Sequence, residues 1–218
     1  MYEEPLQVEA AETPPALDVP VILPEQEPVA PAVVAPAIRA VPPPAPVPEM
    51  PRPRIQLGFK PAAASATDER AAVQFVLTVA NVGNAPARRV RMEARMFAMG
   101  EDHDAALAAF FAAPLEHATS IASSIPPGVS TDLRTQVTLP RAAVRPIRHA
   151  DRMLFVPVVA INLLYEWDDG EEGQTAMSYV IGRENRPPVA KMAPFRLDQG
   201  PRVYREVGHR EHELRRVA

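Results

Sequence analysis

Hydrophobic and polar residues alternate with a period of two along several stretches of this 218-residue chain. The clearest case is residues 72–97, where alternate positions are apolar on both sides of a short turn. A period of two is typical of β-strands that bury one face. Residues 72–81 and 88–97 are therefore predicted to form two successive strands.

Five further stretches carry strand signals and are separated by short polar or Pro- and Gly-containing segments. They are residues 54–60, 116–124, 130–139, 153–167 and 174–182. The stretch at 153–167 is apolar on both faces, which predicts a central strand covered on both sides. We place a β-bulge at Pro157 because proline lacks an amide hydrogen for the ladder. Residues 61–70 are small and polar and predict a loop.

One segment, Asp102–Ala113, has the pattern of an amphipathic helix. An apolar stripe at helical spacing is formed by Leu107, Phe110 and Phe111. We expect this stripe to lie on the strands, and Asp102 or Asp104 to cap the N-terminus.

Seven strands and one helix predict an all-β fold, a seven-stranded β-sandwich with one short inserted helix over residues 54–184. The connection at residues 81–86 is too long for a two-residue hairpin, so the strands on its two sides are expected in opposite sheets. That arrangement is typical of an Ig-like sandwich. Residues 185–218 mix few apolar residues with many charges and predict a C-terminal extension that is partly docked or flexible.

The first 53 residues have a different composition from the rest. They contain 15 of the 27 prolines, eight acidic residues and no aromatic residue after Tyr2. Dense proline prevents helix and sheet, and a segment without aromatic residues has little from which to build a core. We predict a disordered, acidic, Pro-rich tether over residues 1–53. Because a tether usually joins two things, we also hypothesise a membrane anchor encoded upstream of Met1.

No membrane-targeting signal is visible in the given sequence. The N-terminus lacks a basic segment followed by an apolar one. The longest apolar run, residues 153–165, is shorter than the roughly 20 residues that a spanning helix needs. The chain as given is expected to be soluble, and a cell-envelope location depends on the hypothetical anchor.

Two groups of arginines form the candidate interaction surface. They are Arg89, Arg91 and Arg95 on the strand at 88–97, and Arg141, Arg145 and Arg148 in the segment between two strands. Guanidinium groups bind phosphate and carboxylate, so these surfaces make the chain a candidate binder of an anionic polymer or lipid. The alternative is a solvated sheet face whose arginines pair with neighbouring strands. No aromatic residues are interleaved with them, and nucleic acid is not expected as a partner.

Metal sites have only weak signals in the sequence. The absence of cysteine excludes disulfides and thiolate ligands. The five acidic residues in 166–172 offer oxygen ligands for calcium, but without the spacing of an EF-hand. His103 stands beside acidic residues that point in different directions at a helix start, and His209 and His212 would supply only two ligands from a helix. No metal and no cofactor is therefore expected.

Catalytic motifs are missing from the sequence. Candidate acid–base groups are His117, His149, Glu166 and Asp168. They do not form a Ser-His-Asp order, and neither a nucleophile elbow nor a Gly-rich phosphate loop accompanies them. We expect a non-catalytic interaction or structural module with no small-molecule substrate and an unidentified protein partner. An enzyme of unrecognised type is the remaining alternative.

Two segments resemble a known family. Residues 77–92, LTVANVGNAPARRVRM, and residues 125–133, IPPGVSTDL, resemble the turns and strands of bacterial Ig-like domains of the CARDB type. The resemblance covers roughly residues 54–183, with the helix as a departure from the plain pattern. It implies a domain of the bacterial cell envelope, as in proteins that carry such a domain after a membrane segment and a Pro-rich stretch. It supplies no catalytic residues.

Overall fold

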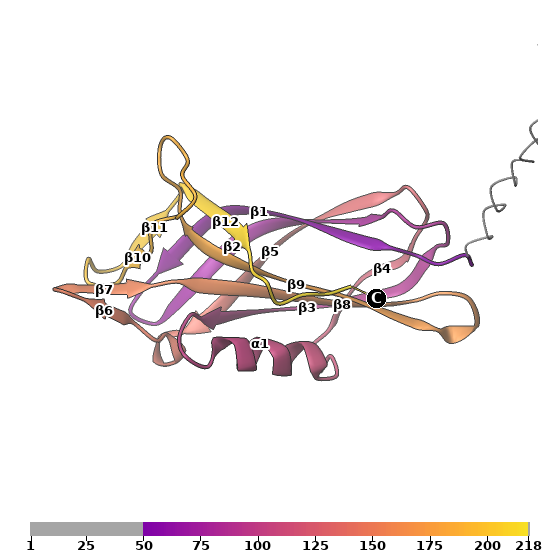
Figure 1. Ribbon diagram of the computed structural model, residues 1–218, viewed down its shortest axis with the longest axis horizontal. Helices are drawn as coiled ribbons and strands as arrows, with labels where there is room; N and C mark the ends of the chain where they lie inside the picture. Colours follow the sequence, from indigo (N-terminus) through magenta and orange to yellow (C-terminus); the bar gives the residue numbers. More distant parts are fainter. Residues whose placement is uncertain (1–49, 218) are drawn as a thin grey trace, which may run out of the picture. The chain divides into compact units, whose positions relative to one another are not determined.

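The computed structural model describes residues 50–217, so the predicted tether lies almost wholly outside the described residues. The described part is all-β with one α-helix, and its strands form three antiparallel sheets (Figure 1). The predicted fold class is confirmed.

Two sheets face each other and enclose the core. The first contains, in spatial order, β1 (Ile55–Ala66), β2 (Arg70–Asn81) and β5 (Ser130–Pro140). The second contains β4 (Thr119–Ile125), β3 (Ala87–Ala98), β8 (Pro157–Glu166) and β9 (Glu172–Arg183). β2 and β3 lie in opposite sheets, as predicted. The grouping of β3, β8 and β9 in one sheet matches the third, sixth and seventh strands of an Ig-like sandwich.

The core is built from alternate residues of the facing strands. It includes Val73, Phe75, Leu77 and Val79 of β2, and Val159, Ile161 and Leu163 of β8. The intervening residues of β8 are also buried, because the helix α1 (His103–Ala112) covers the outer face of this sheet. Leu107, Phe110 and Phe111 pack there against Val158, Ala160 and Ala176. The predicted apolar stripe and the double-sided burial of this strand are both confirmed.

Side-chain amides of β8 and β9 hold the C-terminal end of α1. Gln174 Nε2 donates hydrogen bonds to the Phe111 carbonyl at 2.7 Å and to Asn162 Oδ1 at 2.9 Å. Asn162 Nδ2 lies 3.4 Å from the Phe110 carbonyl, so two carbonyls of the last helical turn find partners on the sheet. The predicted N-terminal cap was wrong. Asp102 stands at the cap position but makes no side-chain capping hydrogen bond.

Two predicted boundaries were also wrong. Residues 61–66 continue β1 through a bulge at Ala62, because small side chains still allow pairing with β2. The predicted single strand at 153–167 is broken at Val156. Its first part, β7 (Arg152–Phe155), belongs to a third sheet with β6 (Ile147–His149) and β10 (Phe195–Arg196). Pro157 therefore begins a new strand, β8, rather than forming a bulge.

The C-terminal segment adds short strands to the sheets. They are β11 (Arg202–Tyr204), which pairs with β1, and β12 (Val207–Glu211) and β13 (Arg216–Val217), which pair with β9. The 3₁₀ turns are η1 (Arg141–Ala143) and η2 (Asp168–Gly170). Nη1 and Nη2 of Arg210 each donate to the Glu184 carboxylate at 3.1 Å, which fixes β12 to the end of β9 and lowers the pKa of the Glu184 carboxyl. His209 thus lies on a strand and His212 after it, and the helical placement of the two histidines was wrong.

Asn81 organises the crossing between the two sheets. Its side chain is fully buried, and Nδ2 donates to the carbonyls of Ala85 and Ile125 at 2.8 and 2.9 Å. Its Oδ1 accepts from the amides of Gly83 and Arg54 at 3.0 and 3.2 Å. One side chain therefore joins the crossing to the start of β1 and the end of β4.

Gly83 is required at this crossing by close approach of the backbone. A Cβ atom there would lie within 3.0 Å of backbone atoms of Arg52, Pro53 and Arg54. The segment before β1 packs across the position where a side chain would begin.

Removal of the Asn81 amide should cost more stability than any surface change. In Asn81→Ala, two amides and two carbonyls lose their partner inside the protein, and we expect a loss of about 3 kcal/mol of unfolding free energy.

Gly83→Ala should lower the unfolding free energy by about 2 kcal/mol through steric overlap. Urea denaturation measures both changes.

Gly100→Ala is the matched control for Gly83→Ala. A Cβ atom at Gly100 has nothing within 4 Å, so this variant should keep the stability of the wild type. Equal stability of the two alanine variants would contradict the steric role of Gly83.

Candidate functional site

The arginines of β3 meet the acidic residues of the β8–β9 hairpin. Arg89 forms an ion pair with Glu166, Arg91 lies 3.6 Å from Glu172, and Arg88 lies 3.9 Å from Asp168. β3 and β8 are neighbours in the sheet, and β8 continues into the hairpin, so the two charged stretches are brought together by strand pairing. The acidic residues considered for calcium and the arginines considered for an anion are therefore partners of one another.

Arg95 is engaged differently from its neighbours. Its Nε donates to the buried Glu93 carboxylate at 2.6 Å, and its guanidinium lies 5.1 Å from the centre of the Phe110 ring. The same carboxylate faces the backbone amide of His117 at 3.3 Å. Arg95 thus connects β3 to α1, and Glu93 connects β3 to the segment before β4.

The second arginine group lies on other elements. Arg141 is in η1, Arg145 follows it, and Arg148 is on β6. Arg145 lies 3.4 Å from the carboxylate of Asp102 before α1. A free anion would have to compete with carboxylates already facing Arg89, Arg91, Arg95 and Arg145.

The candidate acid–base groups occupy separate elements. Glu166 and Asp168 face arginines at the β8–β9 hairpin, while His149 lies on β6 and His117 in the loop before β4. Within residues 50–217, the one group of three potential metal-ligating side chains is made of other residues, namely His103, Asp104 and His212.

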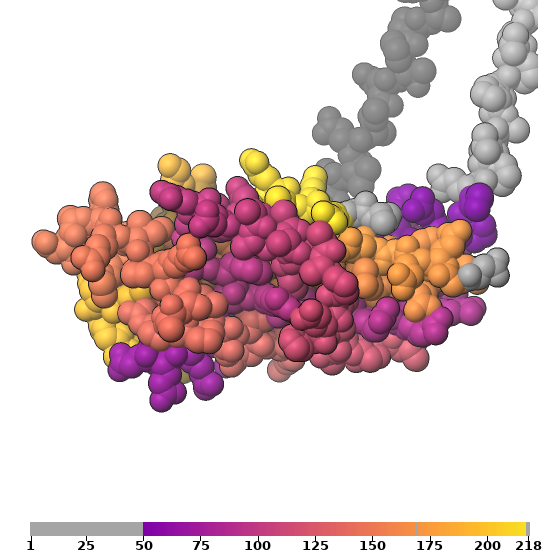
Figure 2. Space-filling model, turned by 90° about the horizontal axis from the view of Figure 1, so that it is seen from below, coloured from indigo at the N-terminus to yellow at the C-terminus, as the bar shows by residue number. Residues whose placement is uncertain are grey.

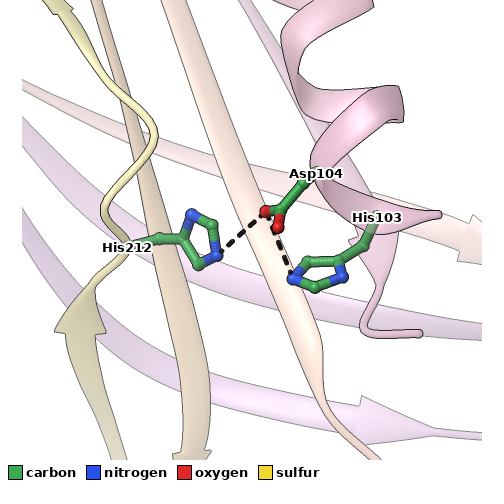
Figure 3. Close-up of side chains that lie close together, drawn as sticks. All are labelled: His103, Asp104 and His212. Carbon is green, nitrogen blue, oxygen red and sulfur yellow. Dashed lines mark ion pairs between the residues drawn. The ribbon is translucent and has the colours of Figure 1, made fainter. Parts of the chain in front are cut away.

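The group of His103, Asp104 and His212 joins α1 to the C-terminal segment (Figure 3). His103 and Asp104 begin α1, and His212 lies in the bend between β12 and β13. Figure 3 shows the Asp104 carboxylate pointing between the two imidazole rings. The rings are mostly buried, with 18% and 16% of their side-chain surfaces exposed, whereas Asp104 is 63% exposed.

This group is not predicted from the sequence because its members lie far apart along the chain. In the sequence, His103 stands beside acidic residues, and the histidine nearest to His212 is His209. The pairing of β12 with β9 carries the C-terminal segment across the sheet to the side of α1, and Figure 2 shows C-terminal residues beside the helix. No local motif signals a contact between such distant residues.

β4 forms a free edge of the second sheet. It pairs with β3 on one side only, and its other side carries no strand in the described part of the chain. The strand contains no charged residue, and four of its hydroxyl residues are exposed: Thr119, Ser120, Ser123 and Ser124. A one-residue bulge at Ile121 is its only register shift.

His209 lies in an aromatic cluster between β12 and the core. Its ring contacts those of Phe59 and Tyr179 with centroid distances of 5.4 and 5.6 Å. Burial lowers the pKa of His209, and Arg210 lowers it further. Burial together with Glu211 raises the pKa of Tyr179 to about 12. His209 therefore packs as a neutral ring.

Acid should weaken the fold through His209. The lowered pKa means that His209 binds a proton more readily in the unfolded chain than in the folded one. As the pH falls below the unfolded-state pKa near 6.5, proton binding therefore favours the unfolded chain and lowers the free energy of unfolding. We expect His209→Phe to reduce the loss of unfolding free energy between about pH 7.5 and 5.5. Chemical denaturation at several pH values measures this loss, with the exposed His149→Gln as control. An unchanged pH dependence in His209→Phe would contradict the assignment.

Comparison with known proteins identifies no relative of this chain. No protein-family model matches the chain, and no curated protein or solved structure matches it. No helix within residues 50–217 is long and apolar enough to cross a bilayer. The geometry of the candidate sites is therefore the evidence for their function.

Proposed function

We propose that this domain is a non-catalytic interaction module that binds a protein partner through the free edge of β4. The observation that carries the proposal is the chemistry of this edge. Unpaired amides and carbonyls of an edge strand pair readily with an extended segment of another chain, a common mode of peptide recognition.

The two edges of the first sheet carry protections that β4 does not. β5 carries Asp132 and Arg134 and ends at Pro140, and β11 has three residues. Charges, proline and short length are the usual means by which proteins keep an edge from pairing. β4 has seven residues and no charge, so it is the edge most open to an added strand.

The cell envelope is the proposed location. This part of the proposal rests on the resemblance of residues 54–183 to CARDB-type domains and on the Pro-rich composition of residues 1–53. A domain carried on such a segment would reach partners at a distance from an anchor. Binding of an anionic polymer or lipid by the arginines is the less favoured function, because most of them already face carboxylates.

A charge on the β4 edge should weaken partner binding. Ser123 is exposed on β4, and Ser123→Lys places a solvated charge on the edge that the partner strand would approach. We expect binding to weaken by about tenfold or more, equivalent to at least 1.4 kcal/mol. Retention of envelope proteins on the immobilised domain, followed by hydrogen exchange of the β4 amides in the complex, measures this effect.

Thr138→Lys provides the matched control. Thr138 is exposed on β5, the edge of the other sheet, and this variant should retain the partner as the wild type does. Equal retention by the two lysine variants would reject the β4 edge as the binding surface. Retention that depends on salt and disappears on Arg148→Gln would favour the arginine surface instead.

A further inference from the structure

We propose that His103, Asp104 and His212 bind a first-row divalent metal ion, with zinc as the best match. This metal site lies between α1 and the C-terminal segment, and it is independent of the proposed role of β4. The spacing of the three side chains, their chemistry and the contacts that hold them all favour a bound metal ion.

The spacing of the ligand atoms is that of a coordination sphere. Asp104 Oδ1 lies 3.5 Å from His103 Nε2 and 3.4 Å from His212 Nε2. Zinc bonds of about 2.0–2.1 Å in a tetrahedron place neighbouring ligand atoms roughly 3.3–3.4 Å apart. A direct charge-assisted hydrogen bond would be shorter, at about 2.7–2.9 Å. All three ligand atoms lie within 4.8 Å of one another, so a small movement of the side chains would place them around one ion.

The donor set selects the class of metal. Two imidazoles and one carboxylate suit zinc, copper or nickel, whereas calcium and magnesium prefer oxygen ligands alone. Three protein ligands leave a fourth position of a tetrahedral ion open. Because Asp104 is 63% exposed, water can reach the group and could fill this fourth position.

His103 already has the tautomer that metal binding requires. Its Nδ1 makes a short contact with the Gly100 carbonyl, which can only accept a hydrogen bond. The proton therefore resides on Nδ1, and the lone pair of Nε2 faces Asp104. The same arrangement, with the second ring nitrogen bonded to a carbonyl, orients histidine ligands in known metal sites.

His212 is held by its backbone on both sides. Its amide donates to the Ser178 carbonyl at 2.9 Å, and Ser178 Oγ donates to the Leu214 carbonyl at 2.8 Å. Leu214 also packs against the apolar residues under α1. The bend that carries His212 is therefore fixed on β9 beside the helix, and little rearrangement is needed to bring the ligands together.

Metal binding requires one local change at His212. The Leu214 amide lies 3.2 Å from Nδ1 of His212, so the metal-free ring carries its proton on Nε2, toward Asp104. When Nε2 binds a metal, this proton must move to Nδ1, and the contact with the Leu214 amide must open. The Leu214 amide is consequently a specific reporter of binding.

The test is a zinc titration of the untagged, chelator-treated full chain by calorimetry. We expect saturable binding of one equivalent, a higher unfolding midpoint and a displaced Leu214 amide resonance. Asp104→Asn and His212→Gln should each weaken binding about 100-fold or more, since they remove direct ligands and even outer-shell partners contribute about 10- to 100-fold. His149→Gln, on exposed β6, should bind as the wild type does.

Two outcomes would overturn the proposal. One is wild-type binding that does not saturate at one equivalent, and the other is equal affinity in Asp104→Asn, His212→Gln and His149→Gln. Circular dichroism of the metal-free variants shows whether they are folded. Asp104→Asn is the most informative variant, because the side chain is exposed and the change nearly isosteric. Ser123→Lys should keep full zinc affinity, so failure at β4 and failure at the metal site are distinguishable.

Discussion

The sandwich depends on a single buried amide, that of Asn81, at the point where the chain passes from one sheet to the other. A crossing between sheets leaves backbone groups without ladder partners, and buried groups of this kind must be satisfied locally. The Asn81 side chain bonds four of them, on β1, the crossing and β4. This arrangement holds the two sheets face to face and thereby sets the position of the β4 edge.

Strand alternation made much of the fold predictable from sequence. Residues of β2 and β5 alternate between more and less exposed positions as their pattern indicates, and the apolar stripe of α1 packs where the two-sided burial of β8 requires a cover. The break at Val156 was not predictable in this way. Proline at 157 signals the loss of a hydrogen bond, but whether a strand bulges or ends depends on neighbours that only the tertiary structure supplies.

The candidate sites were harder to predict than the fold, for a different reason. Pairing of the β3 arginines with neighbouring strands was expected from the sequence, but their partners in the acidic hairpin were considered only as oxygen ligands for calcium. The metal-site residues come from the first turn of α1 and from a bend after β12, and only the pairing of β12 with β9 brings them together. Charge and ligand type can be read from sequence, whereas proximity across a sheet cannot.

The attachment of the N-terminal segment has a mechanical consequence. The Arg52 amide donates to Asn84 Oδ1, the Asn84 amide donates to the Arg52 carbonyl, and the Val82 amide donates to the Arg54 carbonyl. A pulling force that arrives through residues 50–54 would load these three bonds before it reaches the ladder of β1 and β2. The crossing loop would then act as a clamp that shields the hydrophobic core from tension on the preceding segment.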